Sequence, residues 1–187
     1  MDEQLPLPEK AKEFFYYVGR AITVWAHVDE QLSKLFASII KTERRQHAAM
    51  IYYSTKTIGG RLALTNDFVK TVLPERDKAK GEHPSEIEKK WKALYDDIGD
   101  TLPIRNRLAH SKAGLTAEHG SRDDGEIVIT DVYWASYMSL TERLKTDMRV
   151  DPPPEVKTED IKIHIASVEK LIDRLDAFRD ELSKLPQ

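Results

Sequence analysis

Apolar residues recur over residues 8–39 in steps of three and four, with polar positions between them. That spacing places the apolar side chains on one face of a 3.6-residue helix over about eight turns. Pro8 suits the first turn of such a helix, and Gly19 is tolerated inside it at a cost of about 1 kcal/mol. We therefore expect one long helix with a single buried face. The residues on that face are Ala11, Phe14, Phe15, Val18, Ile22, Trp25, Val28, Leu32, Leu35, Phe36 and Ile39.

Three further helical segments are expected before residue 110. One covers residues 43–53, one starts near Gly60, and one covers residues 85–102. The polar segment 74–86 contains both proline and glycine, which predicts a loop. Pro103 is expected to kink or restart the last of these helices, because a proline ring removes a backbone donor and clashes with the preceding turn.

The pattern changes after Gly114. Residues 118–126 read as a turn, and residues 126–134 are β-branched and aromatic, which predicts a strand and one arm of a hairpin. Residues 150–160 form a second irregular connection, and the helical period then returns over residues 158–185. The apolar residues of this last period are Ile161, Ile165, Val168, Leu171, Ile172, Leu175, Phe178 and Leu182.

This order of elements predicts an all-α fold. We expect an up-and-down helical bundle of about five helices, with a small β-hairpin insertion, at roughly residues 120–150, before the last helix. Residues 1–187 are expected to form a single domain. The composition, with 40% hydrophobic and 33% charged residues, is typical of a globular protein with a highly charged surface.

Charge and cysteine content limit the chemistry. The net charge is −3, so any binding of RNA or DNA must come from a local basic patch. The chain has no cysteine, which excludes disulfides, thiolate catalysis and cysteine-ligated metals, and which fits a reducing compartment. The acidic start of the chain does not resemble a secretory signal, and no apolar run approaches the roughly 20 residues of a membrane helix. A cytoplasmic protein without membrane contact is expected.

The common motifs for phosphates, dinucleotides and metals are missing from the sequence. It contains no G-x-x-x-x-G-K-[ST], no G-x-G-x-x-G after a strand, no H-E-x-x-H and no paired E-x-x-H. The scattered histidines read as surface or half-buried polar residues; they are His27, His47, His83, His119 and His164. We expect neither a metal nor a cofactor.

The run "LPIRNRLAHSKAG" concentrates Arg105, Asn106, Arg107 and His110 among apolar residues. A guanidinium can hold a phosphate through two hydrogen bonds and stabilise charge that builds on its oxygens. An imidazole, whose pKa usually lies near neutrality, can move a proton from an attacking hydroxyl or to a leaving oxygen. A helix restarted after Pro103 would add free N–H donors near Arg105. The run therefore fits cleavage of RNA by its own 2′-hydroxyl, without a metal ion.

A structural reading of the same run is also open. The two arginines can pair with acidic side chains on the helix surface; the candidates are Glu86, Glu88 and Asp100. His110 can be favoured simply by the C-terminal end of the helix before Gly114.

The run "RNRLAH" resembles the R-x4-6-H motif of the HEPN superfamily, in which a polar residue usually follows the arginine. Arg105, Asn106 and His110 match it. In the first helix, "WAHVDEQL" resembles a pattern of aromatic, apolar, acidic and leucine residues that is common at that place in the family. The resemblance covers most of the chain in outline, and the short motif is its specific part.

The resemblance implies a helical domain that dimerises, so that two copies of the motif line one cleft. Many HEPN domains are metal-independent endoribonucleases that leave 2′,3′-cyclic phosphate ends. They act as toxins beside an antitoxin, in phage defence or in RNA processing. Others have lost activity and bind RNA or a protein partner, which is the alternative reading here. A dimer also suits the spacing, because an arginine and a histidine five positions apart lie about 140° apart around one helix.

By this resemblance Arg105 binds the scissile phosphate, and His110 is the general base or acid. Asn106 orients one of them or bonds across the dimer axis. An acidic residue on an early helix of the family often contacts the motif arginine. Asp29 is the candidate for this supporting role, and Glu30 is the alternative.

Basic residues that could hold the substrate cluster with aromatic ones after the first helix, where tyrosines could stack bases. Arg107 is expected at the rim of the site and Lys112 beside it. The candidates for substrate binding are Lys41, Arg44, Arg45, Arg61, Arg107 and Lys112. The alternative is that the cations complement a helix C-terminus while the tyrosines lie in the core.

Overall fold

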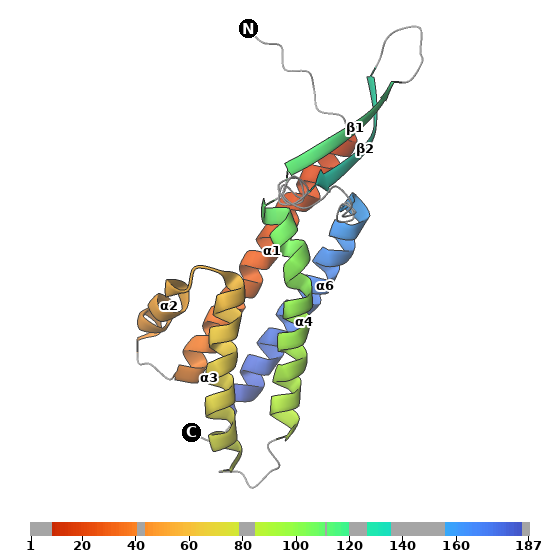
Figure 1. The fold of residues 1–187 in the computed structure, drawn as a ribbon. Helices are drawn as coiled ribbons and strands as arrows, with labels where there is room; N and C mark the ends of the chain where they lie inside the picture. Colours follow the sequence, from red (N-terminus) through yellow and green to blue (C-terminus); the bar gives the residue numbers. More distant parts are fainter. Residues whose placement is uncertain are drawn as a thin grey trace, which may run out of the picture. The chain divides into compact units, whose positions relative to one another are not determined.

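The computed structural model (Figure 1) describes residues 9–40, 44–78, 85–110, 112–119, 127–135 and 156–184. For both strands, Arg45, residues 74–78 and Ser85 it describes the backbone alone. The described elements are the helices α1 (Glu9–Ile40), α2 (Arg45–Ser54), α3 (Ile58–Lys78), α4 (Ser85–His110) and α6 (Thr158–Ser183), and the strands β1 (Lys112–His119) and β2 (Ile127–Ala135).

The prediction of a helical fold is confirmed for the described residues, which contain five helices. β1 and β2 pair in antiparallel register, with a shift between Thr116 and Ala117. β1 thus lies before the expected range of the β insertion, residues 120–150, and most of that range falls outside the described residues.

A kink or a restart of the helix was expected at Pro103, and of these two alternatives the restart is wrong. α4 is one helix from Ser85 to His110 with Pro103 inside it. Proline has no N–H to donate, so the carbonyl of Gly99, four positions earlier, lacks the usual helical partner at that point. The free N–H groups that a restarted helix would have placed near Arg105 are therefore not available.

The chain divides into two compact units. Unit 1 contains Met1–Thr23 and Ile104–Ala166, and unit 2 contains Val24–Pro103 and Ser167–Gln187. α1, α4 and α6 each contribute residues to both. The single domain expected for residues 1–187 stays a prediction.

In unit 2, α1 and α3 run in the same direction. Asp29 contacts Arg61, and further along both helices Phe36 packs edge-to-face on Phe68, with ring centroids 5.1 Å apart. Residue numbers therefore rise together along the two helices. The short α2 lies between them in the chain and makes this parallel arrangement possible (Figure 1).

α4 runs antiparallel to α6 within unit 2. Lys90 Nζ lies 2.7 Å from Glu181 Oε1, and Arg174 Nη1 lies 2.6 Å from Asp97 Oδ2, so numbers rise along one helix as they fall along the other. In the core, the rings of Trp91 and Phe178 pack with centroids 5.6 Å apart. α4 and α6 are thus joined by apolar contact inside and by ion pairs outside.

In unit 1, α1 and α6 are joined by Lys162. Its ammonium lies 2.9 Å from Glu13 Oε1 and 4.9 Å from the centroid of the Tyr17 ring. His164, two positions after Lys162 and therefore on the opposite side of α6, is 3% exposed. The expectation that this histidine is at most half-buried is therefore wrong.

The buried side chains of α1 form a narrow row along the helix, here called the seam. Its positions recur every seven residues, in steps of three and four. Its members are Ala11, Phe14, Val18, Ala21, Trp25, Val28, Leu32, Leu35 and Ile39. Two residues predicted on this face, Phe15 and Ile22, are 40% and 52% exposed. Each lies one position beside the seam, because a seam of 3.5-residue period is narrower than the 3.6-residue face used in the prediction.

Candidate functional site

The motif residues Arg105, Asn106, Arg107 and His110 occupy the last two turns of α4, in unit 1. Arg105 Nη1 donates a hydrogen bond to Asn106 Oδ1 at 3.1 Å. Asn106 and His110 are exposed, whereas Arg105 is half-buried. The helix thus presents an amide and an imidazole to solvent beside a guanidinium that is partly covered.

The helical positions of these residues show what one protomer can do. Arg105 and His110 lie about 140° apart around α4, and Asn106 lies at an angle between them. The hydrogen bond to Asn106 therefore draws the Arg105 guanidinium toward the side of α4 that carries His110. A phosphate on this side can contact the imidazole directly and the guanidinium at its edge.

Arg107 lies on a different side of the same helix. It is half-buried, and its Nε atom is shielded from solvent. This position favours the structural role that the sequence left open for Arg107.

Asp29 and Arg61, predicted for two separate roles, contact each other in unit 2. Arg61 Nε donates to Asp29 Oδ1 at 2.9 Å, and Nη2 donates to Asp29 Oδ2 at 2.8 Å. Arg61 Nη1 donates to the Thr55 carbonyl at 3.0 Å, just after α2. The guanidinium of Arg61 thus holds a carboxylate and a helix end together, which favours a structural role over substrate binding.

Tyr52 completes this polar cluster. Its hydroxyl donates to Asp29 Oδ1 at 2.8 Å, and the Arg61 guanidinium lies 5.6 Å from the centroid of its ring. Burial raises the pKa of Tyr52, and the Asp29 carboxylate raises it further. The phenol therefore stays protonated and remains a hydrogen-bond donor. That Asp29 supports Arg105, a residue of the other unit, stays a prediction.

The remaining predicted residues are scattered. Glu30 is exposed and pairs with Lys34 at 2.8 Å, and the hydrogen bond from Lys34 lowers the pKa of Glu30. Arg44 is exposed at the start of α2. Three predicted cations have side chains outside the described residues: Lys41, Arg45 and Lys112.

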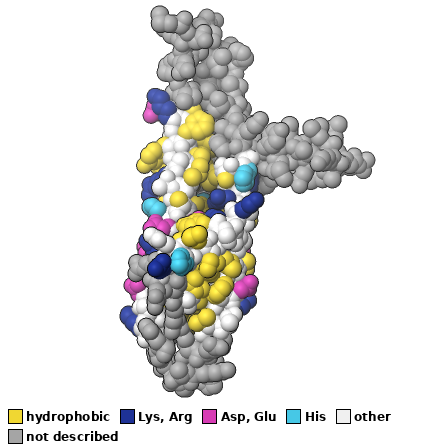
Figure 2. All heavy atoms as spheres, turned by 90° about the vertical axis from the view of Figure 1, so that its left-hand side faces the viewer, with side chains coloured by type: hydrophobic (Ala, Val, Ile, Leu, Met, Phe, Trp, Pro, Cys, Tyr) yellow, Lys and Arg dark blue, Asp and Glu magenta, His cyan; other side chains and the backbone are white. Residues whose placement is uncertain are grey.

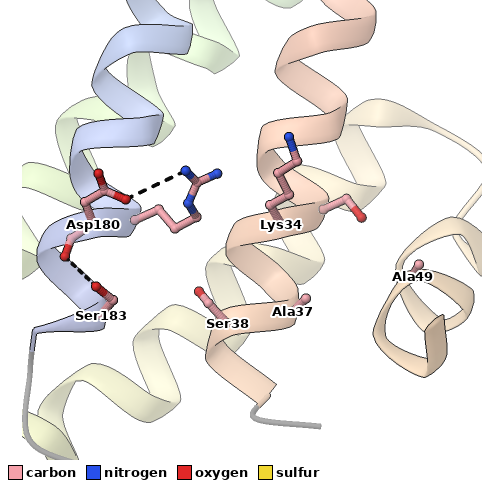
Figure 3. Close-up of a pocket in the computed structure, with 8 residues that line it drawn as sticks. Lys34, Ala37, Ser38, Ala49, Asp180 and Ser183 are labelled. Atoms are coloured by element: carbon pink, nitrogen blue, oxygen red, sulfur yellow. Dashed lines mark hydrogen bonds and ion pairs between the residues drawn. The ribbon is translucent and has the colours of Figure 1, made fainter. Parts of the chain in front are cut away.

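A pocket of about 640 Å³ lies in unit 2 between α1, α2 and α6 (Figure 3). Lys34 stands on α1, and Asp180 and Ser183 stand on α6. Arg179 lines it too; its Nη1 donates to Gln31 Oε1 at 2.7 Å. Each cation of the pocket is matched by a carboxylate, since Lys34 pairs with Glu30 and Arg179 pairs with Asp176 and Asp180. The described residues that line this pocket thus carry no surplus charge that would select an ion.

Unit 2 also exposes apolar side chains. Met50, Ile51 and Tyr53 on α2 are 71%, 48% and 49% exposed, and Phe68 on α3 is 37% exposed. Figure 2 faces the side from which α2 projects in Figure 1, and it shows hydrophobic side chains gathered there among basic and histidine side chains.

Comparison of the chain with family models, with curated proteins and with solved structures finds no match. In the described part of the chain, no helix is long and apolar enough to cross a membrane. The same described residues contain no group of three or more histidine, aspartate or glutamate side chains that could hold a metal ion.

Proposed function

We propose that this protein is a HEPN-type, metal-independent endoribonuclease that acts as a homodimer. The observation that carries the proposal is the placement of Arg105, Asn106 and His110 on neighbouring turns at the end of α4. Arg105 is bonded to Asn106 at 3.1 Å there, and His110 is exposed. In this proposal, the paired strands β1 and β2 are the insertion that precedes the last helix, α6.

In the proposed reaction, His110 takes the proton of an RNA 2′-hydroxyl, and the oxygen attacks the adjacent phosphorus. The bond from phosphorus to the 5′-oxygen breaks, and that oxygen leaves with a proton from a second imidazole or from water. The products are a 2′,3′-cyclic phosphate and a 5′-hydroxyl. Arg105 stabilises the negative charge that builds on the phosphate oxygens.

The proposal includes a dimer because Arg105 and His110 of one motif lie on two different sides of α4. Two copies related by a two-fold axis place a second Arg105 and a second His110 along the same groove. One histidine can then act as the base while the other acts as the acid. Action as a toxin, in phage defence or in RNA processing follows from the family resemblance, with an antitoxin or another protein as a partner.

The test is cleavage of single-stranded RNA by the purified protein in EDTA. We expect products with 2′,3′-cyclic phosphate ends, and a loss of about 10²–10⁴-fold in rate for His110→Ala and for Arg105→Ala. His47→Ala, which removes an exposed histidine of α2, is the matched control and should cleave like the wild type. Cleavage by His110→Ala at the wild-type rate would show that the motif does not catalyse the reaction.

A second function is favoured by one observation. The Arg105 guanidinium is bonded to the neighbouring Asn106, as in a polar network that serves a contact surface. Under this alternative the protein is a catalytically inactive HEPN-like dimer that binds RNA or a protein partner. It predicts no cleavage of any RNA by the wild type, together with RNA or partner binding that Asn106→Ala weakens.

A further inference from the structure

A second pocket of unit 2 lies between α3 and α4, outside the motif and outside the cluster of Asp29 and Arg61. Its volume is about 320 Å³, which lies at the lower end of the range for small-molecule sites. Its walls combine apolar and aromatic groups: Val69 and Leu73 from α3, Trp91 and Tyr95 from α4. The two aromatic rings lie 6.3 Å apart, tilted by 48°. Such walls fit a small, flat, aromatic ligand.

Asn66 supplies a directed polar group in this pocket. It is 7% exposed, and its Oδ1 accepts a hydrogen bond from Trp91 Nε1 at 3.1 Å. An indole N–H can only donate, so this bond fixes which end of the amide faces Trp91. The Nδ2 group consequently points away from the indole, and its two hydrogens meet no acceptor among the described residues. This donor faces the pocket, and a ligand with an acceptor would pair with it.

The charges of the described residues that line the pocket are balanced. Lys70, Lys92, Glu88 and Asp96 all line it, and Lys92 pairs with Asp96 across one turn of α4. This leaves one cation, Lys70, and one carboxylate, Glu88, which is half-buried and can accept hydrogen bonds. A net charge of zero favours a neutral ligand, and the carboxylate favours one that offers N–H or O–H donors.

We propose that the pocket between α3 and α4 binds a free nucleobase or nucleoside. The heterocycle lies against Tyr95 and Trp91, a ring acceptor takes a hydrogen bond from Asn66 Nδ2, and a ring amine or a ribose hydroxyl donates to Glu88. This proposal is independent of the proposed nuclease function, because it involves none of the motif residues.

The test is titration of the full-length protein with the four common nucleosides and their free bases. Binding is measured by calorimetry and by ligand-observed NMR. At least one nucleoside should bind with a Kd below about 1 mM. Glu88→Gln and Asn66→Asp should each weaken it about 10-fold or more, since each removes one hydrogen-bonding function at nearly constant shape. Asp67→Asn changes an exposed neighbour on α3 and should leave binding unchanged.

Three results would overturn the proposal. One is no binding of any nucleoside or base at about 5 mM. Another is binding of indole as tight as that of any nucleoside and insensitive to Glu88→Gln, which would identify a merely apolar cavity. The last is binding of oligonucleotides alone, which would assign the surface to RNA. Because Glu88 lies at the pocket edge, Glu88→Gln should fold even where Asn66→Asp does not, and thermal unfolding of each variant checks this.

Discussion

Asp29 and Arg61 stand on different helices and form a two-point ion pair, with Nε 2.9 Å from Oδ1 and Nη2 2.8 Å from Oδ2. Their side chains are only 18% and 13% exposed. Tyr52 of α2 donates to the same carboxylate at 2.8 Å. One carboxylate thus joins α1, α2 and α3.

We expect Asp29→Ala and Arg61→Ala each to lower the free energy of unfolding by about 2–3 kcal/mol, because each leaves a largely buried charge without its partner. Urea denaturation measures the change. The double variant should cost less than the sum of the two single variants. Glu30→Ala, next to Asp29 but exposed in its pair with Lys34, is the control and should change stability little. Unchanged stability of Arg61→Ala together with lost RNA binding would restore Arg61 to the substrate role.

Tyr52→Phe tests the third member of the cluster. Loss of its hydrogen bond should cost about 1 kcal/mol at neutral pH. Since the pKa of Tyr52 is raised in the folded protein, the folded state holds a proton that the unfolded state releases above about pH 10. Stability should therefore fall as the pH rises above 10, and less steeply in Tyr52→Phe. Equal slopes in the two proteins would contradict the assignment.

His164 should make unit 1 sensitive to acid. Burial lowers the pKa of His164 to about 4, so the unfolded state binds a proton below its usual pKa of about 6.5 while the folded state does not. Stability is complete above about pH 6.5 and declines toward pH 4, by about 2–3 kcal/mol near pH 4.5. Replacement by leucine should flatten this part of the pH profile, measured by chemical denaturation. His27→Leu, at an exposed position of α1, should keep the wild-type slope.

Two helical glycines should respond to alanine in opposite directions. A Cβ on Gly99 would meet nothing within 4 Å, whereas a Cβ on Gly60 would lie 2.7 Å from Thr55 Cγ2. Gly99→Ala should raise stability by about 0.5–1 kcal/mol, because alanine loses less backbone entropy in a helix. Gly60→Ala should lower it by about 1 kcal/mol or more. Thermal unfolding of both variants gives the signs, and a destabilised Gly99→Ala would mean that the space beside Gly99 is occupied by another molecule in solution.

The sequence pattern predicted the helices because periodic burial is a local property of a chain. α1 extends over Glu9–Ile40, close to the expected residues 8–39. The same pattern also held an unused signal for His164, which lies three positions after Ile161 and four before Val168, on the apolar face of α6. A histidine on the apolar face of a helix is expected to lie in the core, although its side chain is polar.

Contacts between helices could not be predicted in the same way. The pairing of Asp29 with Arg61, and of Asn66 with Trp91, depends on which helices pack together and at what register. No spacing within one helix carries that information. The motif residues, in contrast, lie within two turns of α4, so their order around the helix followed from the sequence alone.

Pro103 interrupts the hydrogen-bond ladder of α4 without ending the helix. The carbonyl that lacks a helical donor belongs to Gly99, which also has no side chain that could pack against this turn. One helical hydrogen bond is therefore missing between these two positions, and the part of α4 that belongs to unit 2 ends at Pro103. Amide hydrogens in this turn should exchange with solvent faster than those one turn earlier. Any binding event that stiffens the turn would restrict the angular freedom of the arginine and histidine that follow it.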